Sequence, residues 1–144
     1  MSAHIRVKVI CLFEQEGLFL FAEGYDPSKT QHYLMPVGGG VEFGERCEDA
    51  IRREVQEEIG IEALNLRQLT VLENLFTFDG IAGHEIVFVY QADLAAPLSL
   101  LRGVESNGEE FNLRWLTRQQ IDALGWPVFP EGLLDVMPAM NERF

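Results

Sequence analysis

The sequence contains little that would stabilise an extracellular protein or carry it into a membrane. Only two of its 144 residues are cysteines, Cys11 and Cys47. Cys11 lies in an apolar, strand-like stretch and Cys47 in a helix-like one, so we expect two buried thiols in a reducing compartment rather than a disulfide. No run of about 18 apolar residues occurs, so a membrane span is not expected. The first residues lack the basic start and apolar stretch of a signal peptide, which favours a cytoplasmic protein.

Positive charge is also scarce. The chain has 11 Lys and Arg residues against 23 Asp and Glu residues, which gives a formal net charge of -12. Such a surface repels phosphate backbones, so general nucleic-acid binding is disfavoured. Most of the carboxylates are expected to do no more than keep the protein in solution. One cluster near the middle of the chain needs another explanation.

The chain is long enough to bury a sizeable core. Hydrophobic residues make up 47% and charged residues 24% of it, the balance of a globular protein. No internal repeat, low-complexity tract or linker divides the sequence. We therefore expect a single domain over residues 1–144.

Apolar patterning predicts strands on both sides of a central helix. In the first strand, apolar residues alternate around Arg6 and Lys8. Strands are expected at 5–13, 18–21, 33–37, 64–78, 84–92 and 111–116. Helices are expected at 47–59, from Thr117 to Leu124, and at 131–137. This order predicts the α/β class, with a mixed β-sheet between helices.

The connections follow from turn residues. Glu16-Gly17 and Asp79-Gly80 predict tight turns. The stretches 24–32 and 94–108 are expected to be loops. The three glycines at 38–40 predict a backbone that either bends sharply or lets another group approach closely.

The central helix carries three glutamates on one face. Because a helix turns about 100° per residue, residues spaced i, i+3 and i+4 share a face, as Glu54, Glu57 and Glu58 do. Such carboxylates repel one another by roughly 0.2–0.5 kcal/mol for a pair, unless cations neutralise them. Hard divalent ions such as Mg²⁺ or Mn²⁺ prefer carboxylate oxygens. On spacing alone, a solvated acidic face is favoured over a metal site.

The residues around these glutamates reverse that preference. The pattern G-x5-E-x7-R-E-U-x-E-E-x-G-U, where U is a bulky aliphatic residue, is met by Gly39, Glu45, Arg53, Glu54, Val55, Glu57, Glu58, Gly60 and Ile61. This segment, 39–61, resembles the Nudix box of the Nudix (MutT-like) hydrolases at every specified position. The order of elements is also similar to the Nudix α/β/α sandwich, so the resemblance covers nearly the whole chain.

The resemblance implies a role for each box residue. It assigns Glu54, Glu57 and Glu58, together with the backbone carbonyl of Gly38, as ligands of Mg²⁺ or Mn²⁺. It gives Arg53 an orienting role. Members commonly have proline directly before the glycines, whereas Val37 stands there in this chain. That departure alters the entry from strand to loop and leaves the metal chemistry intact.

Two roles stay open at this point. Glu45, just before the helix, either favours the helix N-terminus or steadies a catalytic glutamate. The general base is either Glu54 or a carboxylate in a loop after the box, where Glu105, Glu109 and Glu110 are candidates. Among these three we favour Glu109 or Glu110. The alternative is that this run is a solvated loop.

The aromatic residues outside the box also allow two interpretations. Phe76 and Phe78 are expected in the strand core, although one ring could stack on a base. His32 and Tyr33 are expected on a loop surface rather than against a substrate. The upstream pattern of coenzyme A hydrolases is absent, and Leu75 stands where many ADP-ribose hydrolases have proline. Nucleotide sugars, nucleoside triphosphates and dinucleoside polyphosphates stay open as substrates.

The resemblance as a whole implies a metal-dependent pyrophosphohydrolase. Water would attack one phosphorus of a small-molecule nucleoside diphosphate derivative. A homodimer is plausible by the same resemblance. One alternative is a non-catalytic nucleotide-binding Nudix module, since fold does not guarantee chemistry, although no glutamate of the box is degenerate. A diphosphate isomerase is a second alternative, and the short chain argues against it.

Overall fold

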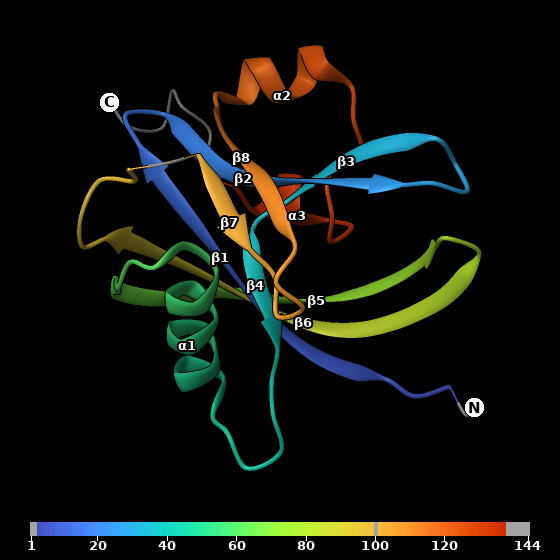
Figure 1. Ribbon diagram of the computed structural model, residues 1–144, viewed down its shortest axis with the longest axis horizontal. Helices are drawn as coiled ribbons and strands as arrows, with labels where there is room; N and C mark the ends of the chain where they lie inside the picture. Colours follow the sequence, from blue (N-terminus) through green and yellow to red (C-terminus); the bar gives the residue numbers. More distant parts are fainter. Residues whose placement is uncertain (1–2, 100, 138–144) are drawn as a thin grey trace.

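The computed structural model describes residues 3–99 and 101–137, which form a curled sheet with helices on both sides (Figure 1). The strands are β1 (Arg6–Gln15), β2 (Leu18–Asp26), β3 (Gln31–Met35), β4 (Val37–Gly40), β5 (Ala63–Phe78), β6 (Ile81–Leu94), β7 (Arg102–Val104) and β8 (Glu110–Leu116). The helices are α1 (Cys47–Ile59), α2 (Arg118–Leu124) and α3 (Leu133–Val136). The strand order is β5-β6-β1-β2-β8-β7, with β3 paired to β2 and β4 paired to β1.

Strand β1 lies at the centre of the molecule. It runs parallel to β6 and antiparallel to β4, so the sheet is mixed. Successive side chains of β1 point to opposite faces. Cys11 and Phe13 pack in the cluster under α1, whereas Ile10 and Leu12 pack in the cluster under α2 and α3. The α/β class with a mixed sheet between helices is therefore confirmed.

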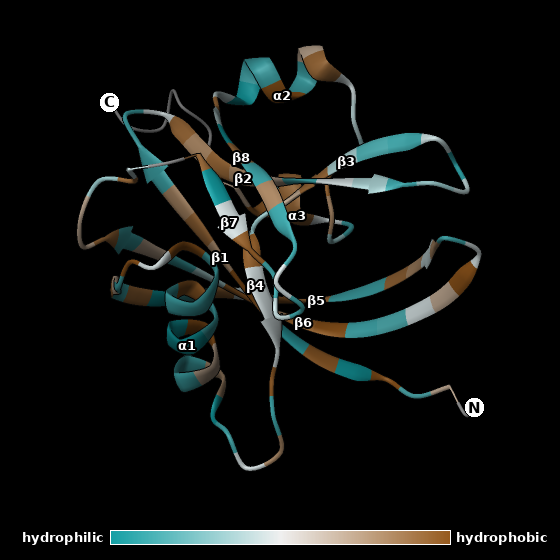
Figure 2. Ribbon diagram, viewed as in Figure 1, coloured by the Kyte–Doolittle hydropathy of each residue, from teal (hydrophilic) through white to brown (hydrophobic). Residues whose placement is uncertain are grey.

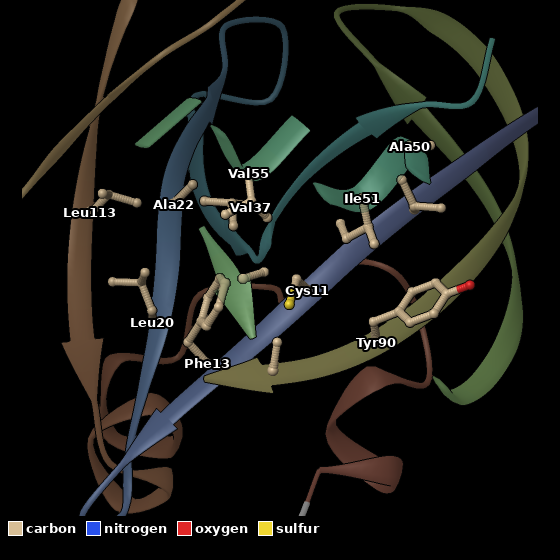
Figure 3. Close-up of a cluster of buried hydrophobic side chains, with 13 residues drawn as sticks. Cys11, Phe13, Leu20, Ala22, Val37, Ala50, Ile51, Val55, Tyr90 and Leu113 are labelled. Carbon is tan, nitrogen blue, oxygen red and sulfur yellow. The ribbon is translucent and has the colours of Figure 1, made fainter. Parts of the chain in front are cut away.

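Helix α1 has the bounds that the sequence predicts. Ile51 and Val55 are fully buried and lie with Cys11 and Val37 in one cluster against the sheet (Figure 3). The outward side of the helix is hydrophilic (Figure 2). Gly60 ends the helix in the left-handed conformation, with φ of 70°, and its N–H donates to the Gln56 carbonyl. The apolar stripe therefore fixes which face of α1 is left for the glutamates.

The glycine segment differs from the expected bend. Residues 38–40 lie in β4, and Gly38, Gly39 and Gly40 pair with Ile10, Val9 and Lys8 of β1. A Cβ on Gly38 would lie 2.0 Å from the carbonyl oxygen of Val9. The sharp bend that was one of the two expectations is therefore wrong, because these residues are part of a strand. The alternative of close approach is confirmed, because only a residue without a side chain lets β4 lie against β1 here.

Three other elements differ from the prediction, and in two of them strand pairing is the reason. The expected loop 24–32 is mostly strand, since β2 continues to Asp26 and β3 begins at Gln31 in a hairpin. The expected loop 94–108 contains the short strand β7. The last helix covers only Leu133–Val136, after Gly132 with φ of 91°. Pro138, expected near its end, lies outside the described residues.

Both cysteines are free thiols, as the sequence predicts. Cys11 is buried and Cys47 is half-buried, and burial raises the pKa of both. Among residues 3–99 and 101–137, no helix is long and apolar enough to cross a membrane.

Candidate active site

The glutamate face of α1 lies against the glycine strand β4. The backbone N–H of Gly38 donates a hydrogen bond of 2.9 Å to Oε1 of Glu58. The carboxylate of Glu54 lies directly over Gly39, where a Cβ would come within 2.4 Å of the carboxyl carbon. The glycines therefore do two jobs: they let β4 lie close to β1, and they leave room for the carboxylates of α1.

Arg53 is the centre of the hydrogen-bond network on this face. Its Nε and Nη2 donate to the two carboxylate oxygens of Glu45, at 2.7 and 2.8 Å. Its Nη1 donates to Glu54 at 2.8 Å and to Glu57 at 3.3 Å. Its Nη2 also donates to the carbonyl of Gly40 at 3.1 Å. The guanidinium thus holds one glutamate outside the helix against two on it.

The contacts of Glu45 bear on the two roles left open for it. The helix N-terminus takes no hydrogen bond from a side-chain cap. Hydrogen bonds from Arg53 instead lower the pKa of Glu45 to about 2, with help from the backbone N–H of Glu42. These contacts favour the role on Arg53, which also bonds Glu54, over a cap of the helix, and the role of Glu45 stays a prediction.

Glu58 is partly buried beside Gly38. Burial, together with the negative charges of Glu54 and Glu105, raises its pKa to about 8, against the opposing hydrogen bond from Gly38. Lys8 also opposes the shift. A partly buried carboxylate beside other carboxylates is stabilised in its charged form by hydrogen bonds and by a nearby cation.

The donor set fits a hard divalent cation by its chemistry. Glu54, Glu57 and Glu58 offer only carboxylate oxygens, which Mg²⁺ and Mn²⁺ prefer. As they stand, no three His, Cys, Asp or Glu side chains in the described part of the chain converge closely enough to hold a metal. Arg53 bonds both Glu54 and Glu57 in this arrangement. The ligand roles, including that of the Gly38 carbonyl, stay predictions.

The carboxylates line a cleft of about 720 Å³. Arg6 of β1 and Glu105, in the turn after β7, line it with them. A second hollow beside it, also lined by Glu54, Glu58 and Glu105, extends along Gly38 to Gly40. The cleft therefore joins a strongly negative helix face to a positive side chain on the central strand.

The structure places Glu105, rather than Glu109 or Glu110, on the wall of the cleft. Glu110 is on β8, where its side chain is 62% exposed and pairs with Arg102 at 3.5 Å. Glu109 is exposed, and neither residue lines the cleft or the hollow beside it. The turn between β7 and β8, closed by the Glu105 N–H to the Glu109 carbonyl, separates the three carboxylates. The position of the side chains therefore favours Glu105 over the expected Glu109 or Glu110, and the identity of the base stays a prediction.

Sequence reasoning did not select Arg6 for the site. A signal was present, because Arg6 and Lys8 interrupt the apolar pattern of β1 with spacing i, i+2 and so lie on one face of the strand. Both line the hollow beside the glycines. In a chain with net charge -12, positive side chains at a cleft are suited to binding phosphate.

Comparison with known proteins identifies the family to which this fold and site belong. The NUDIX domain model matches residues 3–135, so the chain belongs to the NUDIX family. A NUDIX hydrolase from Nitrosomonas europaea has the same fold, with a TM-score of 0.70 at 21% identity over 92% of this chain and 86% of that one. A MutT NUDIX hydrolase from Burkholderia pseudomallei is 25% identical, with a TM-score of 0.60 over 85% of this chain and 98% of that one.

Two curated relatives are similar in sequence. The ADP-ribose pyrophosphatase of Escherichia coli (strain K12) is 32% identical over 111 residues, which are 77% of this chain and 50% of the relative. The nucleoside triphosphatase NudI of Escherichia coli (strain K12 / DH10B) is 61% identical over 64 residues, 43% of this chain and 45% of the relative. The chain thus spans about half the length of the curated relatives it matches.

Proposed function

We propose that the protein is a divalent-metal-dependent hydrolase that cleaves a pyrophosphate linkage in a nucleoside diphosphate derivative. The observation that carries the proposal is the ordered carboxylate face of α1, held by Arg53 and Glu45 over glycines at the wall of a cleft. Two relatives in the family are named for acting on ADP-ribose and on nucleoside triphosphates. ADP-ribose therefore joins nucleotide sugars, nucleoside triphosphates and dinucleoside polyphosphates as a candidate substrate.

In this proposal Glu54, Glu57 and Glu58, with the carbonyl of Gly38, hold Mg²⁺ or Mn²⁺. When bound there, the ion would neutralise charge on the phosphate oxygens and lower the pKa of the attacking water. Arg53 keeps Glu54 aimed into the cleft through their 2.8 Å hydrogen bond.

The remaining residues supply proton transfer and substrate binding. Glu105 accepts the proton of the attacking water, because it is the loop carboxylate on the cleft wall. Arg6, which lines the same cleft, binds phosphate oxygens. Glu54 is the second candidate for the base, although Arg53 already occupies one of its carboxylate oxygens.

A substrate panel with and without metal tests the proposal. We expect hydrolysis of at least one compound among ADP-ribose, nucleotide sugars, nucleoside triphosphates and dinucleoside polyphosphates in Mg²⁺. EDTA should abolish the reaction and added Mg²⁺ or Mn²⁺ should restore it, as measured by chromatography of the products. Calorimetric binding of a nucleotide without turnover of any compound would favour the non-catalytic module instead.

Replacing Glu45 tests the network around Arg53. We expect Glu45→Gln to lower kcat/KM by about 10- to 100-fold, because a group that orients a metal ligand typically contributes that much. Stability should fall by about 1–3 kcal/mol, because the side chains of Glu45 and Arg53 are only 17% and 25% exposed and share two charge-assisted hydrogen bonds. The matched control is Glu48→Gln on the solvent side of α1, where the carboxylate is 63% exposed and pairs with Arg52 at 3.8 Å. Equal activity of the two variants would remove Glu45 from the site.

A further inference from the structure

The side chain of Tyr33 was expected on a loop surface, but it lies on β3 where two hollows of the molecule meet. It lines the hollow beside the glycines of β4 and also a cavity of about 270 Å³ between the β2–β3 and β5–β6 hairpins. Glu54, Glu58 and Glu105 line the first of these hollows with it. The phenol is therefore an uncharged hydrogen-bond donor in a hollow whose walls carry several carboxylates.

The ring of Tyr33 is held in one place. It meets Phe78 and Phe129 edge-on, with ring centroids 6.2 and 5.5 Å away. Tyr33 pairs with Gly24 across the β2–β3 hairpin, and a Cβ on Gly24 would lie 2.1 Å from Cζ of the ring and 2.5 Å from the hydroxyl oxygen. The absence of a side chain at Gly24 therefore leaves the space that the phenol occupies.

Glu105 is fixed at its backbone but not at its carboxylate. Its N–H donates to the Glu109 carbonyl at 2.8 Å, and its own carbonyl accepts from the Gly108 N–H at 2.9 Å. Within residues 3–99 and 101–137, no group forms a hydrogen bond or ion pair with its carboxylate. A general base is normally oriented by a further group, so the proposed role of Glu105 requires a hydrogen-bond donor near it.

Tyr33 suits this task better than the other side-chain donors around the hollow, which are Arg6, Lys8 and Ser106. A cation that bonded a carboxylate would make it a weaker proton acceptor, whereas a neutral phenol orients it with a smaller change in basicity. Lys8 also pairs with Glu85, at 3.5 Å. Ser106 is exposed. The hydroxyl of Tyr33 has no hydrogen-bond partner in the described part of the chain.

The charge of Glu105 acts on the phenol. Burial raises the pKa of Tyr33, and the negative charges of Glu105 and Asp26 act in the same direction. Asp26 already accepts hydrogen bonds from Ser28 and from the Asp79 N–H, which leaves Glu105 as the carboxylate without a partner. An anion beside a phenol favours the protonated form, which is the form that donates. The two side chains are not bonded as they stand, and hydrogen bonds at catalytic sites often tighten only when substrate binds.

We propose that Tyr33 is the positioning residue of Glu105. When substrate fills the hollow, the phenol donates to the Glu105 carboxylate and holds it toward the attacking water. Glu105 accepts a proton from that water, and the hydroxyl of Tyr33 keeps its own proton throughout. The inference rests on the proposed function for the reaction in which Glu105 is the base.

Removing the hydroxyl alone tests this role. Tyr33→Phe keeps the ring and its edge-on contacts. We expect it to lower kcat about 10-fold with KM little changed, because an orienting hydrogen bond to the base acts in the transition state. The matched control is Tyr25→Phe on the same hairpin, where the side chain is 44% exposed and its ring meets His32 instead of the hollow. This control should keep full activity, and urea midpoints in EDTA should show that both variants are folded.

A double variant shows whether Tyr33 acts through Glu105. Glu105→Gln should lower kcat by about 10²-fold or more, the usual contribution of a general base, and adding Tyr33→Phe should then cause no further loss. A raised KM in Tyr33→Phe, or the same loss in both backgrounds, would mean that the phenol binds substrate directly and would overturn the proposal. Unchanged kcat in Tyr33→Phe or in Glu105→Gln would also overturn it, and would leave the proposed function standing with Glu54 as the base.

A measurement without turnover separates this inference from the proposed function. In EDTA, NMR of the ring carbon that bears the hydroxyl follows the titration of each labelled tyrosine, and Tyr33→Phe assigns the signal of Tyr33. We expect Glu105→Gln to lower the pKa of Tyr33, because a nearby negative charge is removed, and Glu109→Gln to leave it unchanged. An unchanged titration in Glu105→Gln would overturn the pairing. Absence of turnover by the wild type is a different result: it removes the proposed function, whereas the titration still supports or overturns the pair.

Discussion

Replacing Glu58 with glutamine is expected to reduce hydrolysis by about 10³-fold while the protein stays folded. Glutamine keeps the shape of the side chain and can still accept the 2.9 Å hydrogen bond from Gly38. It removes a carboxylate from the set proposed to hold the metal, and metal stabilisation of transition-state charge is worth several kcal/mol, at about 1.4 kcal/mol for each tenfold change in rate. Single-turnover rates with Mg²⁺, and Mg²⁺ affinity by calorimetry, measure both parts of the effect.

Stability without metal should move in the opposite direction to activity. The pKa of Glu58 is about 8 in the folded protein, above its usual value of 4.5, so ionisation opposes folding. This unfavourable contribution is absent below pH 4.5, grows as the pH rises, and is complete above about 8. In EDTA, wild type should therefore lose stability relative to Glu58→Gln across this window, as measured by urea unfolding at several pH values.

A matched variant separates the site from the helix as a whole. Asp49→Asn changes a carboxylate that is 66% exposed on the solvent side of α1, and should leave both activity and its metal dependence unchanged. Full activity in Glu58→Gln would contradict the ligand assignment. A variant that loses activity by unfolding would be recognised by its urea midpoint in EDTA.

The parts of the fold that the sequence predicts well depend on local signals. Helix α1 is predicted with its observed bounds because its apolar stripe and Gly60 lie within the segment itself. Helix α2 is predicted from Thr117, which forms a capping box with Gln120. The turn at Asp79-Gly80 joins β5 to β6 for the same reason. In each case a few neighbouring residues decide the conformation.

The parts that the sequence mispredicts depend on distant partners. Strand β4 exists because three glycines pair with β1, and glycine alone indicates only freedom to bend. Strand β7 has three residues, too few to show a pattern. Since β7 and its turn decide which of the loop carboxylates faces the cleft, Glu105 could not be chosen over Glu109 from sequence.

In the candidate site, too, the residues set by local spacing are predicted and those set by tertiary contacts are not. Spacing alone puts Glu54, Glu57 and Glu58 on one helix face, and the structure has them there. Phe76 and Phe78 were expected in the strand core, but they line a cavity of about 270 Å³ between the β2–β3 and β5–β6 hairpins. These hairpins are remote in sequence, so the sequence does not predict that they form a cavity together. Local periodicity predicts on which face of a strand a side chain lies. Only the tertiary structure shows which other elements pack against that face.

The glycines of β4 are expected to separate the fold from the chemistry when each is replaced by alanine. A Cβ at Gly38 would lie 2.0 Å from the Val9 carbonyl oxygen and 2.7 Å from Cα of Ile10. Both atoms are backbone of the central strand, so the strands themselves must move. We expect Gly38→Ala to lower the free energy of unfolding by about 3 kcal/mol, the upper end for overpacking. The melting temperature should fall by about 10 °C.

At Gly39 the same added Cβ meets a different kind of obstacle. It would lie 2.4 Å from the carboxyl group of Glu54, the far end of a flexible side chain. The carboxylate can swing aside, so Gly39→Ala should unfold within about 1 kcal/mol of wild type. Its activity should fall about 10²-fold, because misplacing a catalytic group by about 1 Å has an effect of that size. Calorimetric melting should therefore show the larger loss of stability in Gly38→Ala. The kcat/KM of the folded protein should show the larger loss of activity in Gly39→Ala. If Gly38→Ala were as stable as wild type, or Gly39→Ala as active, β4 would not hold the carboxylates in the way the structure indicates.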